Sequence, residues 1–220
     1  MDEMLTHLDE DGITQVSALS SILRYPCGLH QIPQVYFDCS RPRVDPVVCV
    51  NVLSFFYANG RGSDLCKTLD YVYSILDSRS YLDGTRYYTG AEPFLYFLGR
   101  LILISDSVRR RFEPLFQQRL RERIGTNGDS LSLSMRIWAC SVVGVVDDFD
   151  LWKLLTLQTS NGSWEDGWFY KYGSSGILIG NIGLTTAFAI KAIERTRLPH
   201  KTTGQSTPSI ESDFDTGVVV

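Results

Sequence analysis

The chain has 220 residues, of which 44% are hydrophobic and 12% aromatic, and this composition is sufficient for a folded domain with a buried core. Its 21 basic and 25 acidic residues give a formal net charge of −4, which argues against general binding to nucleic acid or to an anionic lipid surface. No apolar run approaches membrane-spanning length, and the acidic N-terminus lacks the apolar core of a signal peptide.

The five cysteines are odd in number and scattered along the chain. They form no CxxC motif and no Cys/His pair at the spacing of a zinc site. We therefore expect reduced thiols, a cytoplasmic protein and no bound metal in this chain.

The pattern of the chain changes at Asp45. Residues 1–44 mix Gly, Pro and Ser with short apolar pieces, and no period persists, so we expect an irregular N-terminal segment. Asp45-Pro46 is then typical of an N-cap followed by proline in the first helical turn. The segment up to Asn59-Gly60 is apolar on nearly all sides, which predicts a buried helix.

Capping residues and apolar periodicity predict six further helices, which begin near Ser63, Pro93, Val108, Asp129, Asp147 and Asn181. No segment is a convincing strand, and the polar tail 197–220 is expected to be disordered. Helices with one apolar face alternate roughly with helices that are apolar on two faces. This alternation predicts an all-α domain over 45–196, made of antiparallel hairpins in which outer helices cover inner ones.

One motif, QxxxGxW, follows the helix expected after Asp147 and consists of Gln158, Gly162 and Trp164. The Gln amide can bond free backbone groups at a neighbouring helix end, the Gly permits a tight turn, and the Trp can stack over the Gln. These roles are structural, so we expect the motif to brace the helices and to take no direct part in chemistry.

This motif resembles the QW repeat of the squalene-cyclase and terpene-cyclase families, and a looser form occurs in protein prenyltransferase β subunits. The segments 45–51, 81–88 and 172–176 are also similar to a fungal group in which a class II terpene-cyclase β domain follows a haloacid-dehalogenase-type phosphatase domain, as in drimane-type sesquiterpene synthases. The resemblance covers about residues 1–16 and 36–195. It implies a partial α/α toroid.

The resemblance also implies a reaction. A class II cyclase protonates the terminal alkene of a prenyl diphosphate with the central Asp of a DxDD or DxDTT motif, and Mg²⁺ is expected with the diphosphate. This sequence contains neither motif, and it also lacks the phosphatase motif DxDx(T/V). The chain therefore resembles the C-terminal part of a longer protein with an upstream phosphatase or cyclase domain, and we expect it to be inactive alone.

The segment 17–35 matches nothing in the family that the chain resembles. Without it, Gly12 to Val16 would join directly to Tyr36-Phe37-Asp38, as in that family. We interpret the segment as a retained short intron. Transcripts from relatives that contain it would contradict this interpretation.

Candidate site residues follow from their types and positions. Those that could line a substrate pocket are Asp45, Asn51, Tyr87, Trp168 and Tyr172, and those that could hold a diphosphate are Arg43, Arg86 and Lys171. Each has an alternative role: the aromatic residues as packing, Asp45 as an N-cap, and the cations as solvated charges.

Two other functions stay open. The chain could be a non-catalytic helical module that packs against another domain or chain. It could also be a protein prenyltransferase β-like subunit, but that subunit needs an Asp, Cys and His zinc site, and no such set is visible here.

Overall fold

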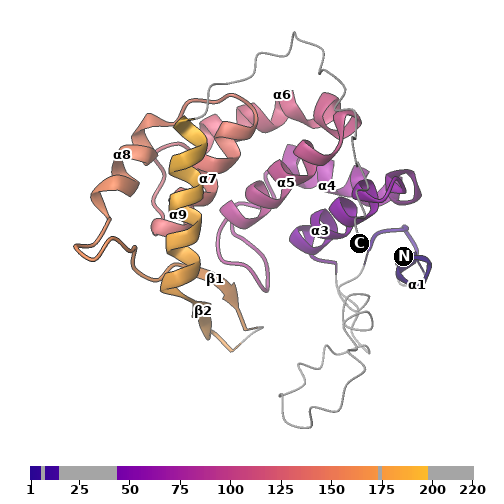
Figure 1. The fold of residues 1–220 in the computed structure, drawn as a ribbon. Helices are drawn as coiled ribbons and strands as arrows, with labels where there is room; N and C mark the ends of the chain where they lie inside the picture. The colour runs from indigo at the N-terminus through magenta and orange to yellow at the C-terminus, as the bar shows by residue number, and fades with distance from the viewer. Residues whose placement is uncertain (6–7, 15–43, 173–174, 198–220) are drawn as a thin grey trace, which may run out of the picture.

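The computed structural model describes residues 1–5, 8–14, 44–172 and 175–197 (Figure 1). The segment 17–35, Arg43 and the tail after Arg197 therefore lie outside the described residues, and the predictions made for them stay predictions. The elements are α1 (Asp2–Leu5), α3 (Pro46–Ala58), the 3₁₀ helix η1 (Gly62–Leu65), α4 (Cys66–Ser78), α5 (Glu92–Ile104), α6 (Asp106–Arg123), α7 (Ser130–Val142), α8 (Asp148–Thr156), β1 (Trp168–Lys171), β2 (Leu178–Gly180) and α9 (Ile182–Arg197). The predicted all-α fold class is confirmed.

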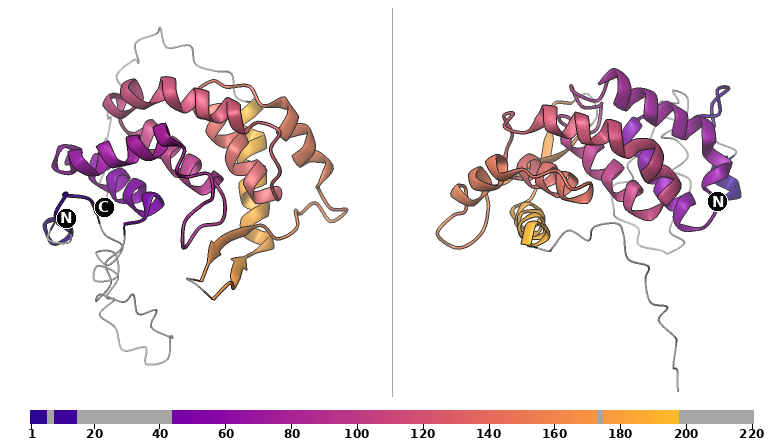
Figure 2. Two further views of the ribbon diagram at one scale, coloured as in Figure 1. Left: turned by 180° about the vertical axis from the view of Figure 1, so that it is seen from behind. Right: turned by 90° about the horizontal axis from the view of Figure 1, so that it is seen from above.

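The helices form two layers. Helices α3, α5, α7 and α9 contact one another in that order, and they follow an arc in Figures 1 and 2. Helices α4, α6 and α8 pack against α3, α5 and α7 respectively. The sequence explains the division, because α3 and α5 are buried over most of their surface, whereas α6 exposes a row of arginines.

Aspartates at the predicted helix starts cap these helices. The carboxylates of Asp45, Asp129 and Asp147 each accept a backbone N–H in the first turn of α3, α7 and α8, at 2.9, 2.8 and 3.1 Å. The cap predicted at Ser63 is wrong. Ser63 lies within η1, and α4 begins at Cys66 with no side-chain cap.

The expectation that the chain contains no strand is also wrong. Strand β1 pairs antiparallel with β2, in a register that places Trp168 opposite Gly180 and Lys171 opposite Leu178. Both strands are shorter than the average strand, and their pairing is not visible as a local period in the sequence. Within the N-terminal segment expected to be irregular, residues 2–5 form the single turn α1, from which Met4 reaches the core.

Among the described residues, no helix combines the length and the apolar character that crossing a membrane requires.

A fully buried arginine connects the two layers. Arg136 on α7 is 0% exposed, and its guanidinium donates hydrogen bonds to the carbonyl oxygen of Arg123 and to the hydroxyl and carbonyl oxygens of Thr126. These bonds hold the connection between α6 and α7 against the body of α7.

Buried carboxylates balance this charge. Arg136 Nε lies 3.2 Å from Asp150 Oδ2, and Asp150, on α8, also accepts the backbone N–H of Gly125. Glu92 at the start of α5 pairs with Arg123 at 2.6 Å and lies 3.9 Å from Arg136. A buried charge needs such partners, because removal from water costs several kcal/mol per ion.

A further buried carboxyl, that of Asp147, adjoins this network. Burial raises its pKa to about 7, and the neighbouring negative charge of Asp150 adds to the shift. Its Oδ1 accepts the N–H of Asp150, and Oδ2 has no partner among the described residues. The unpartnered oxygen is consistent with a carboxyl that holds its proton well above the ordinary pKa of 3.8.

We expect Asp147 to make stability fall as pH rises. The folded chain keeps this proton up to about pH 7, whereas the unfolded chain releases it near pH 4, so the free energy of unfolding falls between these values and levels off above them. Asn can still cap α8 but cannot titrate. As the pH rises from 5 to 8, the free energy of unfolding of Asp147→Asn should therefore increase by on the order of 2 kcal/mol relative to that of wild type.

Urea unfolding at several pH values measures this effect, with the exposed Asp148→Asn as the matched control. The control should follow the wild-type profile. If the free energies of unfolding of Asp147→Asn and wild type differ by a constant amount over pH 5–8, this would contradict the raised pKa of Asp147.

Candidate functional site

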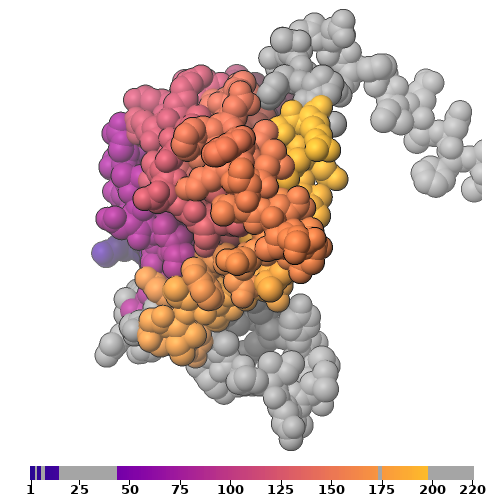
Figure 3. All heavy atoms as spheres, turned by 90° about the vertical axis from the view of Figure 1, so that its left-hand side faces the viewer, coloured from indigo at the N-terminus to yellow at the C-terminus, as the bar shows by residue number. Residues whose placement is uncertain are grey.

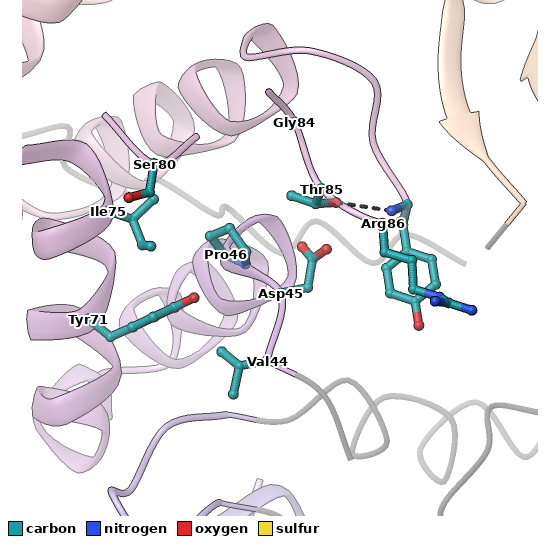
Figure 4. A pocket seen from close by; sticks show the side chains of 10 residues that line it. Val44, Asp45, Pro46, Tyr71, Ile75, Ser80, Gly84, Thr85 and Arg86 are labelled. Atoms are coloured by element: carbon teal, nitrogen blue, oxygen red, sulfur yellow. Dashed lines mark hydrogen bonds between the residues drawn. The ribbon is translucent and has the colours of Figure 1, made fainter. Parts of the chain in front are cut away.

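A pocket of about 450 Å³ lies at the N-terminal end of α3, beside the loop that precedes α5 (Figure 4). Its walls come from the start of α3, from α4 and from the loop that precedes α5. The residues that line it are Val44, Asp45, Pro46, Tyr71, Ile75, Ser80, Gly84, Thr85, Arg86 and Tyr87.

The loop owes its shape to Gly84 and Thr85. Gly84 has a φ of +72°, and a Cβ there would lie 2.4 Å from the carbonyl oxygen of Tyr88. The hydroxyl of Thr85 accepts the backbone N–H groups of Tyr87 and Tyr88, each at 3.1 Å. This turn places Arg86 and Tyr87 at the pocket.

Asp45 is the acid of the pocket and is 3% exposed. Burial raises its pKa; hydrogen bonds from the Thr85 hydroxyl and from the backbone N–H groups of Val47 and Val48 offset part of this rise. Figure 4 shows the Asp45 carboxyl directed toward Thr85. A carboxyl with a raised pKa and a fixed orientation can donate a proton to a bound molecule.

Aromatic rings gather beside the pocket. Tyr87 stacks on Tyr170 with 6.1 Å between centroids, and Tyr88 contacts Phe169 edge-to-face at 5.7 Å. Burial raises the pKa of Tyr88 and of Tyr71 to about 12, so both phenols stay protonated at neutral pH. Neutral aromatic faces of this kind stabilise a cation.

The β hairpin is fastened to this loop. The backbone N–H of Lys171 donates to the carbonyl oxygen of Tyr87 at 2.7 Å, and the Thr89 hydroxyl donates to that of Trp168 at 2.9 Å. The N–H of Trp168 in turn donates to Asp129 Oδ2 at 3.0 Å, so the cap of α7 also holds the hairpin.

The predicted site residues divide into three groups. Asp45, Arg86 and Tyr87 line the pocket, and Lys171 lies on β1, whose backbone bonds Tyr87. Trp168 and Tyr172 are 43% and 49% exposed on the hairpin. Asn51 lies farther along α3, is half-buried and does not line this pocket.

Sequence reasoning missed Tyr71, Ser80 and Thr85 at the pocket. Thr85 follows Gly84, and a hydroxyl residue directly after a turn glycine was the available signal for a side chain that caps the turn. Tyr71 gives no such signal, because its place depends on the packing of α4 against α3.

The expectation that Mg²⁺ accompanies the diphosphate concerns the longer proteins that the chain resembles, and it stays a prediction. The described residues bring no three His, Cys, Asp or Glu side chains together in a group that could hold a metal ion. No chemical step is therefore assigned to Mg²⁺ here.

The QxxxGxW segment forms a closed turn after α8. Trp164 is 2% exposed, and its indole N–H donates to the carbonyl oxygen of Leu154 at 2.8 Å. Gly162 has a φ of +86°. The Gln158 amide donates to the carbonyl oxygen of Gly162 at 2.9 Å, so it bonds within its own loop, whereas the sequence suggested a neighbouring helix end.

Comparison with known proteins gives two matches. The family described as "Sesquiterpene cyclase astC-like C-terminal domain" matches residues 14–59. Drimenol cyclase drtB of Aspergillus calidoustus is 42% identical over 195 residues, which is 88% of this chain and 33% of that protein. The chain matches the C-terminal part of a fungal sesquiterpene cyclase. No solved structure matches it.

The resemblance inferred from the sequence is thus confirmed at the level of a fungal sesquiterpene cyclase. The chain spans about a third of the length of drimenol cyclase drtB. The activity, substrate and partners of a whole cyclase are consequently matters for proposal.

Trp164 should contribute more to stability than its exposed counterpart on α8. Trp164→Ala removes a buried ring and its hydrogen bond, and we expect a loss of about 3 kcal/mol. Trp152 is 66% exposed, and Trp152→Ala is the matched control, with an expected change below about 1 kcal/mol. Gln158→Ala should cost no more than about 1 kcal/mol, because the amide is exposed.

Denaturant unfolding of the three variants measures these differences. Equal losses for Trp164→Ala and Trp152→Ala would show that the motif does not brace the fold.

Proposed function

We propose that this chain is the C-terminal part of a class II terpene cyclase that acts on a prenyl diphosphate by protonation-initiated cyclisation. The observation that supports this most is the 42% identity to drimenol cyclase drtB over 88% of the chain. The helical layers are compatible with part of an α/α toroid, in which α3, α5, α7 and α9 would be the inner helices.

The pocket at Asp45 fits a part of such a site. Its carboxyl is buried, and stacked tyrosines beside it offer faces to a carbocation. Asp45 is also the N-cap of α3, and this structural role accounts for its orientation. Asp45 would thus shape the pocket, while the acid that starts the reaction would come from a DxDD or DxDTT motif, which this sequence does not contain.

A non-catalytic interaction module is the second candidate, and one observation favours it. Helix α8 lies at the surface in Figure 3, and apolar side chains spaced three residues apart are exposed there and just before it: Val146, Phe149, Trp152 and Leu155. An apolar row of this kind is typical of a surface that packs against another domain or chain. The genomic sequence upstream of Met1 separates the candidates, because a DxDTT motif in an open reading frame would favour the cyclase.

The chain alone should not cyclise farnesyl diphosphate. Incubation with this substrate and Mg²⁺, followed by gas chromatography of the extract, should show no cyclic product above a control without protein. The reason is the missing acid motif, since alkene protonation requires a strong and correctly placed donor.

A cyclic sesquiterpene alcohol or diphosphate would contradict this expectation. Asp45→Asn and Asp83→Asn would then identify the donor among the described candidates. Asp38, the third candidate, lies outside the described residues.

A further inference from the structure

A second pocket, of about 490 Å³, lies at the C-terminal end of α5. It is lined by the C-terminal half of α5, by Trp138 of α7 and by the last turns of α9. The last turns of α5 line this pocket, whereas the Asp45 pocket is lined by the start of α3, by α4 and by the loop before α5. The two sites share no lining residue.

Three cations surround this second pocket: Arg100, Lys191 and Arg195. Within the described part of the chain, none of them forms an ion pair, whereas Arg79 and Arg123 each pair with a glutamate. Lys191 Nζ lies 5.3 Å and Arg195 Cζ 5.8 Å from the centre of the Trp138 ring.

Two further contacts of these cations are long. Arg100 lies over the Phe97 ring at 5.7 Å, and Lys191 Nζ is 3.4 Å from the Tyr96 hydroxyl. The lining contains one acid, Glu194, against three cations, so the pocket has an excess of positive charge.

Helix capping does not account for this cluster. Cations near a helix C-terminus interact favourably with the carbonyl ends, but only within the last turn. Arg195 satisfies this condition on α9, whereas α5 has no basic residue in its last turn and Lys191 lies six residues before the end of α9.

The remaining wall is apolar. Leu103 and Ile104 are 43% and 41% exposed at the end of α5, and the buried Trp138 also lines the pocket. A site with several cations and an apolar wall is complementary to an anion that bears an apolar chain.

We propose that this pocket is a second ligand site, separate from the Asp45 pocket, which binds an amphiphilic organic phosphate. Arg100, Lys191 and Arg195 hold the phosphate, and Leu103, Ile104 and Trp138 contact the apolar chain. The proposal does not depend on cyclase activity, because it concerns binding at a pocket that shares no lining residue with the Asp45 pocket.

Isothermal titration of the full chain with two probes, inorganic phosphate and dodecyl phosphate, tests the proposal at low salt. Dodecyl phosphate should bind at least tenfold more tightly than inorganic phosphate, and added salt should weaken both. The triple variant Arg100→Ala, Lys191→Ala, Arg195→Ala should lose at least tenfold in affinity for dodecyl phosphate. Lys191→Met keeps the side-chain stem on Trp138 and on its own should lose about threefold in affinity for dodecyl phosphate. This single variant tests the proposal if the triple variant does not fold.

Two further variants distinguish this pocket from general surface binding. Leu103→Ser should lower the affinity for dodecyl phosphate severalfold and leave that for inorganic phosphate unchanged. Arg110→Ala removes an exposed arginine on α6 that does not line the pocket, and it should change neither affinity. An equal loss in Arg110→Ala and Lys191→Met, or dodecyl phosphate binding that the pocket variants leave intact, would overturn the proposal.

Discussion

The described structure depends on one buried guanidinium. Arg136 is fully enclosed, and it bonds two carbonyl groups and a hydroxyl of the connection between α6 and α7 while it pairs with Asp150 of α8. Its second acidic neighbour, Glu92, begins α5. One side chain thus ties together four helices from both layers. Such a network is costly unless it is complete, because each unpaired buried charge would carry its full desolvation cost.

This network reaches the candidate site through the start of α7. The connection held by Arg136 leads to Asp129, whose two carboxylate oxygens serve different partners: Oδ1 caps α7, and Oδ2 accepts the N–H of Trp168. From Trp168 the hairpin extends to Lys171, whose N–H binds the carbonyl oxygen of Tyr87 at the pocket. The aromatic wall beside Asp45 is therefore positioned by residues far away in sequence.

The features that the sequence predicted correctly depend on residues that lie close together in the chain. The aspartate caps at Asp45, Asp129 and Asp147 act over three residues, and each marked the start of a helix correctly. The strands were not predictable in this way, because the pairing of Trp168 with Gly180 joins two short segments across a loop. Arg86 and Tyr87 were predicted site residues, yet the Thr85 hydroxyl that shapes their turn was missed. The predicted partner of Gln158 was also wrong, because its amide donates to the carbonyl oxygen of Gly162 within the same turn and not to a neighbouring helix end.

The most direct test of the account is an exchange of parts. The third of drimenol cyclase drtB that this chain matches would be replaced by the chain, and product formation from farnesyl diphosphate would be followed by gas chromatography. If the chain is the C-terminal part of a terpene cyclase, the hybrid should form a cyclic sesquiterpene, and Arg136→Ala in the hybrid should abolish it together with the cooperative unfolding of the helices. A hybrid that folds cooperatively and forms no cyclic product would contradict the account.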